Sequence, residues 1–413
     1  MRKNLLAVTA LAVALAPSAG SAGGYSVPNV NPRDLAMAGS LVAAQEGAGA
    51  VFQNPAALGR LEGLHLNLGL SAIDIRSAWH DPNDFGNSSQ MIVKLVFPPA
   101  IYASYGLRLP NDWGLGFGVG MTIPFGGNVY WPDTWPGRFD IDLVERRIFG
   151  TYVTAGLEPV KWLRIGGGFI WYRATEKLLQ GTNYLSYEGS AELGAAGDGF
   201  SYDLSAEIQP IAPLRIGIDY KHQSVIKLTG QAHFNNPPLS LAANTLDQGV
   251  EHELTMPNVL SIGASYRVFP ILLVTAGFQW DRYIVYDKDA FIGTAGTSIV
   301  VPRNYHNGHT YRLGVEGGPI SGFKVRLGVL RDIAPTPREW MSPTIPDSDV
   351  WAASVGVAYM VPGVPNLELS ASYFHAFFDQ VNTVNTPQNV FPGIYDTWAN
   401  IASIGATWKW LPK

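Results

Sequence analysis

The chain has no cysteine, few charged residues and no apolar run long enough for a membrane-spanning helix. The absence of cysteine excludes a disulfide framework, a cysteine-based zinc site and a catalytic thiol. Charged residues make up 15% of the 413 residues, against about 25% in typical soluble domains. Because a membrane-spanning helix needs ~20 apolar residues, a polytopic helical membrane protein is also excluded. The 12 Trp, 18 Tyr and 18 Phe, together with a net charge of only −5, argue against disorder.

Residues 1–22 have the pattern of an export signal. Arg2 and Lys3 form a positive start, residues 5–16 form a short apolar run, and the small residues Gly20 and Ala22 fit a cleavage site. We therefore expect the protein to leave the cytoplasm and the mature chain to begin after Ala22.

The rest of the chain alternates with the period of a β-strand. In residues 113–123, large apolar side chains at odd positions alternate with four glycines and Thr122. A strand with one face in an apolar medium and the other in a polar one alternates in this way. The same pattern predicts fourteen strands: 64–75, 100–109, 113–123, 148–157, 162–175, 199–208, 213–221, 258–268, 271–284, 310–316, 323–332, 350–359, 366–376 and 397–410.

The connections between these segments alternate between long and short. Short turns rich in Pro, Gly and Asn, such as 110–112 and 362–365, alternate with long segments such as 176–198 and 222–257. An even number of strands with short turns at one rim is typical of an outer-membrane barrel, which must close because lipid leaves no partner for an open edge. A soluble sandwich, jelly roll or propeller would carry more charge and would not alternate its loop lengths. We predict an all-β fold in which residues 63–413 form a 14-stranded antiparallel transmembrane barrel in the bacterial outer membrane, with long loops outside.

Residues 23–62 do not alternate and are rich in glycine and alanine. A barrel of this size has a lumen too wide for its own side chains to fill. We therefore expect this segment, called the hatch below, to fold inside the barrel. The four glycines of residues 113–123 either make room for the hatch backbone or ease barrel curvature.

Three stretches of the chain carry recognisable motifs. The hatch contains the run 34–39, Gly/Ala-rich residues 47–50, and the motif Asn54-Pro55-Ala56. The other two stretches are residues 254–257, and Arg331-Asp332 followed by 345–349. Together they resemble the FadL/TodX family of outer-membrane transporters for long-chain fatty acids and aromatic hydrocarbons. The chain departs from the family at two places. Val350 stands where members often have arginine, and Leu411-Pro412-Lys413 follow Trp410, whereas outer-membrane strands commonly end on a terminal aromatic residue.

The resemblance implies passive transport of hydrophobic compounds by loop capture, binding in a lumen pocket, hatch movement and lateral exit. Asn54, Pro55 and Ala56 are then the hatch motif. Apolar Leu239 and Leu241 belong to a candidate capture groove, although such loops could equally pack on one another. Lys177 and Arg173 are candidate partners for a substrate carboxylate.

Other functions have weaker support in the sequence. A general diffusion porin would use inward-facing charges but would have no use for the hatch. An outer-membrane enzyme would need a serine–histidine pair, and no Gly-x-Ser-x-Gly motif occurs. We expect no catalytic residues, cofactor, metal site or nucleic-acid partner, even though His306 and His309 share one loop. The expected partners are hydrophobic small molecules, outer-membrane lipids and lipopolysaccharide, and the expected state is a monomeric barrel.

Overall fold

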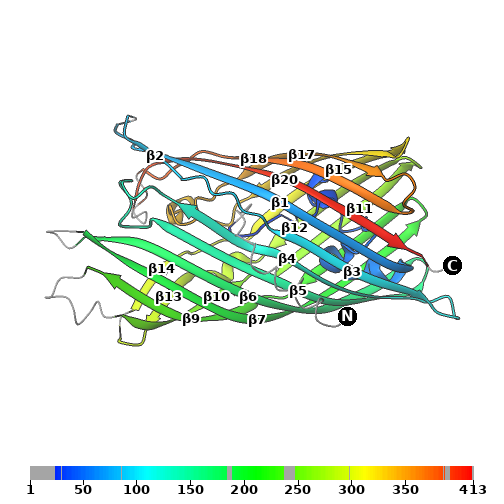
Figure 1. Ribbon diagram of the computed structural model, residues 1–413, viewed down its shortest axis with the longest axis horizontal. Helices are drawn as coiled ribbons and strands as arrows, with labels where there is room; N and C mark the ends of the chain where they lie inside the picture. The colour runs from blue at the N-terminus through cyan, green and yellow to red at the C-terminus, as the bar shows by residue number, and fades with distance from the viewer. Residues whose placement is uncertain are drawn as a thin grey trace.

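The computed structural model describes residues 24–411, apart from 29, 85, 184–187, 237–246, 297, 385 and 387–390. The chain forms an antiparallel β-barrel, and the first described residues, up to Arg60, lie largely inside it (Figure 1). The barrel closes between its first and last strands, which pair from Leu64 with Trp410 to His80 with Ile394. Among the described residues, no helix is both long and apolar enough to cross a membrane.

The strands follow one another in chain order with few helical interruptions. They are β1 (Gly63–His80), β2 (Ser88–Gln90), β3 (Pro99–Arg108), β4 (Gly114–Tyr130), β5 (Leu143–Val160), β6 (Leu163–Asn183), β7 (Glu188–Ile211), β8 (Leu214–Lys221), β9 (Ser224–Asn235), β10 (Gln248–Met256), β11 (Val259–Phe269), β12 (Leu272–Asp281), β13 (Lys288–Gly293), β14 (Ser298–Pro302), β15 (Gly308–Ile320), β16 (Phe323–Ile333), β17 (Val350–Met360), β18 (Leu367–Phe378), β19 (Val381–Asn382) and β20 (Ile394–Trp410). The helices are α2 (Pro32–Ala36), α3 (Ala50–Gln53), η1 (Pro55–Arg60), η3 (Tyr283–Val285) and η4 (Arg338–Trp340).

The described segments make up fourteen barrel strands, as predicted. Six of them are interrupted. Each forms one strand in two pieces: β2 and β3, β8 and β9, β10 and β11, β12 and β13, β14 and β15, and β18 and β19. For example, β7 pairs with β9 along its first half and with β8 along its second.

Side chains alternate between the lipid-facing surface and the lumen as the sequence predicts. On β7, Phe200 and Leu204 are exposed on the outside, whereas Ser201, Asp203 and Ser205 are buried inside. Because only an apolar outer face is stable against lipid, this pattern marks the part of the strand that crosses the membrane.

The predicted long segments 176–198 and 222–257 are mostly strand rather than loop, which corrects the sequence-based boundaries. β6 and β7 continue beyond the predicted ends of these strands. On their outer faces Arg173 pairs with Asp198 at 2.7 Å, and Lys177 pairs with Glu192 at 2.8 Å. Beyond the membrane the outer face no longer needs to be apolar. The alternation of apolar and polar residues therefore ends before the strand does.

The hatch lies inside the barrel near the end that holds the C-terminus, where its helices are blue in Figure 1. A Cβ added at Gly114 or Gly116 of β4 would overlap the backbone carbonyl of Gly59 or Leu58 in η1. A Cβ at Gly118 would overlap the side chain of Val51. These three glycines thus make room for the hatch, which confirms the first of the two interpretations for them.

Candidate binding site in the barrel lumen

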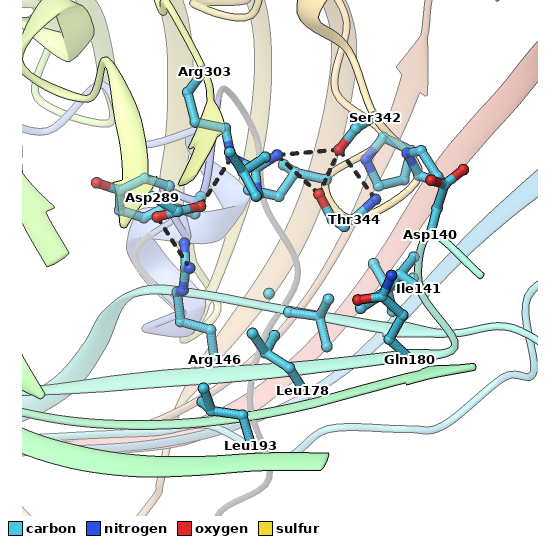
Figure 2. Close-up of a pocket in the computed structure, with 18 of the residues that line it drawn as sticks. Asp140, Ile141, Arg146, Leu178, Gln180, Leu193, Asp289, Arg303, Ser342 and Thr344 are labelled. Carbon is cyan, nitrogen blue, oxygen red and sulfur yellow. Dashed lines mark hydrogen bonds and ion pairs between the residues drawn. The ribbon is translucent and has the colours of Figure 1, made fainter. Parts of the chain in front are cut away.

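A cavity of about 370 Å³ lies in the lumen on the side of the long hairpins, above the hatch. Apolar side chains from several strands and loops form much of its wall. They are Ile75, Met91, Val129, Ile141, Val144, Leu178, Leu193, Phe234, Val250, Phe291, Ile299, Val301, Trp340, Met341, Phe378 and Phe391. Figure 2 shows Ile141, Leu178 and Leu193 on one side of this space and charged residues on another. Such a wall favours a hydrophobic ligand because burial removes apolar surface from water.

Packed aromatic residues of the loops lie beside this cavity. Trp131 and Trp135 stack with ring centroids 4.4 Å apart, and Phe391 contacts both Trp135 and Trp79. The indole N–H of Trp131 donates to the carbonyl of Pro343, which joins two loops at 3.3 Å. The described loops therefore pack on one another over the barrel mouth.

A buried network of charges lies at one corner of the cavity. The guanidinium of Arg146 donates to Glu176 at 2.9 Å. His252 contacts Glu176 through Nδ1 at 2.8 Å and Asp289 through Nε2 at 3.1 Å. Arg303 donates to the other oxygen of Asp289 at 2.9 Å. Because both ring nitrogens of His252 face carboxylate oxygens, both act as donors. The imidazole is therefore protonated on both nitrogens and positively charged.

This network also ties the barrel wall to the loop between β16 and β17. Arg303 donates to Ser342 at 3.1 Å and to Thr344 at 2.9 Å, as Figure 2 shows. Two further acids that line the cavity lie in loops. Burial raises the pKa of Asp140 to about 6 and that of Asp347 to about 7.

The floor of the cavity is the segment 24–28, which we call the strap. Tyr25 is 1% exposed and donates to the carbonyl of Thr255 at 2.6 Å. Its ring packs edge-on against Tyr283 and Tyr286, with centroids 5.3 and 5.2 Å away. The strap is also held by Asp347, which accepts from the backbone N–H of Gly24 at 2.8 Å.

A second cavity of about 110 Å³ lies beneath the strap, between the hatch and the wall. Five charged residues are among those that line it: Asp219, Lys221, Asp281, Arg312 and Asp332. The lower cavity is therefore smaller than the upper one and has more charged side chains for its size, although apolar residues such as Phe52, Phe125 and Phe374 also line it.

The hatch is anchored to the wall by charged and polar contacts. Arg33 pairs with Glu316 at 3.0 Å, and Arg60 pairs with Glu207 at 3.2 Å. Asn54 caps η1, because its Oδ1 accepts from Ala56 N at 3.1 Å while its Nδ2 donates to Val42 O at 2.8 Å.

The barrel wall has a seam beside β4. The β3–β4 ladder ends at Ile101 with Met121, although β4 continues to Tyr130. The preceding segment 91–98 pairs with β1 instead. The backbone N–H of Ile73 donates to the carbonyl of Val96 at 2.8 Å, and the N–H of Val96 donates to the carbonyl of Ile73 at 3.1 Å. The same segment contacts β4 again where the N–H of Ile92 donates to the carbonyl of Tyr130 at 2.7 Å. A bulge between Thr122 and Phe125 interrupts β4 at this height.

The strap is bonded to this part of β4. The N–H of Val27 donates to the carbonyl of Pro124 at 2.9 Å, and the N–H of Gly126 donates to the carbonyl of Tyr25 at 2.8 Å. The floor of the cavity and the seam in the wall are thus directly connected.

Comparison with known proteins identifies the family. The family described as outer membrane protein transport protein (OMPP1/FadL/TodX) matches residues 13–410. The chain belongs to this family. An outer membrane protein of Neisseria meningitidis serogroup B is 23% identical over 89% of each chain. The protein is accordingly an outer-membrane β-barrel, as the sequence predicts.

Solved structures share the fold of this family member. A Pseudomonas aeruginosa FadL homologue is similar with a TM-score of 0.83 at 19% identity, covering 94% of this chain and 99% of that one. The Ralstonia pickettii toluene transporter TbuX has a TM-score of 0.68 at 18% identity, covering 93% and 100%. The Pseudomonas putida toluene transporter TodX has a TM-score of 0.70 at 14% identity, covering 95% and 100%.

Two of the four predicted binding residues face away from the lumen, and the other two lie outside the residues that the structure describes. Arg173 and Lys177 are on the outer face of β6, paired with carboxylates, and neither lines the cavity. Leu239 and Leu241 lie outside the described residues. Among the described residues no cluster suited to a metal ion is found, including around His306 and His309.

The charged network of the cavity was not predicted from the sequence. Arg146 and Glu176 fall in segments that the pattern predicts to be loops. The alternation of inward and outward positions, continued along β6, separates inward Glu176 from outward Lys177. Arg303 and Asp289 lie in the upper part of the barrel, where apolar alternation gives no signal.

Proposed function

We propose that the protein is a passive channel that admits hydrophobic compounds from the extracellular side into the 370 Å³ cavity. The observation that carries this proposal is a large, mainly apolar space inside a barrel that is otherwise filled by the hatch. Its volume is more than twice that of a ~150 Å³ apolar cavity able to bind benzene. The cavity is therefore large enough for two fused rings or a medium alkyl chain.

The lumen below the strap favours a sideways exit. A hydrophobic molecule that moved downward would enter a much smaller cavity, where it would meet five charged side chains and keep fewer apolar contacts. The seam beside β4 is a place in the barrel wall where the β3–β4 ladder has ended, and the strap is hydrogen-bonded to β4 there. We therefore propose that displacement of the strap opens this seam. A ligand that binds more tightly when the strap is displaced than when it is in place shifts the strap toward the displaced position. No energy source is therefore needed.

The similar structures support a hydrophobic substrate. Two of the three solved structures described above bear the names of toluene transporters. The apolar cavity of this chain is the reason for extending a hydrophobic substrate to it.

Binding of radiolabelled naphthalene to the protein in lipid nanodiscs tests the proposal, with empty nanodiscs as the background. Val250→Trp fills part of the cavity, where Val250 is 5% exposed, and should abolish specific binding. Val225→Trp makes the same change on the outer face, where Val225 is 43% exposed, and should leave binding unchanged. Equal binding by both variants would exclude the cavity as the site.

Sugar flux into proteoliposomes separates this function from that of a general porin. The intact mature chain should be tight, and a variant that lacks residues 23–60 should leak. Free passage of sugars through the intact protein would instead indicate a diffusion porin.

A further inference from the structure

The charged side chains of the network beside the cavity satisfy one another's hydrogen-bonding capacity. One oxygen of Glu176 accepts from Arg146 and the other contacts His252. One oxygen of Asp289 contacts His252, and the other accepts from Arg303 and, at 2.6 Å, from Tyr286. Every carboxylate oxygen in the network therefore has a partner within hydrogen-bond distance.

The two arginines of this network are the cations that line the cavity, but neither is available to a new anion. Arg146 is occupied by Glu176 and by the hydroxyl of Tyr286 at 3.1 Å. Arg303 is occupied by Asp289 and by two loop hydroxyls. Their side chains are only 5% and 7% exposed. An incoming carboxylate would have to displace a buried acid to gain charge-assisted hydrogen bonds.

The remaining charges on the described lining are acidic. Asp140 and Asp347 line the cavity together with Asp289, so three carboxyl groups there stand against two guanidinium groups. Lys177 pairs with Glu192 but lies on the outer face of the barrel. His252 is fully buried behind the lining, where both its nitrogens meet acids. A ligand carboxylate would therefore be buried among acids without a free cation, which is costly.

We propose that this channel selects uncharged hydrophobic compounds over carboxylate anions, and that Glu176 and Asp289 determine this selection by occupying Arg146 and Arg303. The inference rests on the proposed transport function and specifies the substrate class of the same cavity. Suitable ligands are hydrocarbons, alcohols and esters. The hydroxyl groups of Ser342 and Thr344 lie beside the cavity for the polar end of an alcohol or ester.

The first test uses the wild-type protein and ligands of equal chain length. Binding of 1-decanol, methyl decanoate and decanoate is measured at pH 8 in nanodiscs, with Val250→Trp nanodiscs as the background for lipid partition. We expect the alcohol and the ester to bind at least about tenfold more tightly than decanoate. A tenfold change in affinity corresponds to the loss of about one hydrogen bond to a charged group. Decanoate binding as tight as that of decanol would overturn the inference. If naphthalene and all three ligands fail to bind, the proposed function itself is wrong.

The second test changes the two acids. Glu176→Gln and Asp289→Asn each keep the side-chain shape but remove the negative charge that occupies an arginine. The ratio of decanoate affinity to decanol affinity should rise about tenfold in each variant. Glu253→Gln is the control, because Glu253 is on the outer face of β10 with a side chain 64% exposed, and its ratio should not change.

Heat-modifiable migration in gels establishes that each variant barrel is folded before binding is compared. An unchanged ratio in folded Glu176→Gln and Asp289→Asn would contradict the role assigned to these acids. If either variant fails to fold, the wild-type comparison still decides the selection itself.

Discussion

Replacing Gly116 by alanine should loosen the hatch without disturbing the barrel. The new Cβ would lie 2.7 Å from the carbonyl carbon of Leu58 and 3.0 Å from its Cβ, whereas ordinary contact begins at 3.4 Å. The carbonyl oxygen of Leu58 would lie closer still, so η1 would have to move by about 1 Å. A shift of this size would break the hydrogen bond from Ala56 N to Ser205, now 2.9 Å long. Overpacking of this kind costs about 1–3 kcal/mol.

Sugar flux into proteoliposomes measures the effect, and gel migration with and without heating reports on the barrel. Gly116→Ala should leak while the barrel remains folded, because its strand ladders are untouched. Gly317→Ala is the matched control, since a Cβ there meets no atom within 4 Å. If Gly116→Ala were as tight as the wild type, the close contact between β4 and η1 would not hold the hatch in place.

Three further changes test the strap and the membrane-facing surface. Burial favours the neutral form of Asp347 and raises its pKa to about 7, so its contribution to stability is present near pH 4 and is lost as the pH rises to about 7. The protection of the Gly24 amide, which is its exchange rate relative to the intrinsic rate at the same pH, should fall over this range in the wild type. Asp347→Asn should make this protection independent of pH, and an unchanged fall in the variant would contradict the role of Asp347. Tyr25→Ala removes the buried floor of the cavity and should destabilise the strap by about 3–5 kcal/mol, seen as faster proteolysis near the N-terminus; unchanged proteolysis would contradict its anchoring role. Leu204→Arg on the lipid face should lower the free energy of unfolding by about 2–4 kcal/mol in refolding experiments. Ile292→Arg, which is also at an exposed position but in β13 beyond the membrane, should lower it by less than about 1 kcal/mol. Equal losses would mean that the membrane boundary is misplaced.

The sequence determined the architecture of the barrel because lipid imposes a local rule. Each spanning strand must present apolar residues at every second position, and this requirement is visible in runs such as 113–123 and 199–208 without knowledge of their partners. The glycine- and alanine-rich composition of residues 23–62 likewise indicated a plug, since the lumen of a wide barrel must be filled.

The binding site depended on relations that no local pattern contains. Arg146, Glu176 and Asp289 come from three separate strands, and their pairing follows from the register of the closed barrel. The same register turns Arg173 and Lys177 outward, although in sequence they are as suitable as Arg146 for meeting a carboxylate. Alternation in the lipid-facing band thus determined the fold from the sequence alone. Only the tertiary structure decided which charges meet in the lumen, because above that band neither face of a strand has to be apolar.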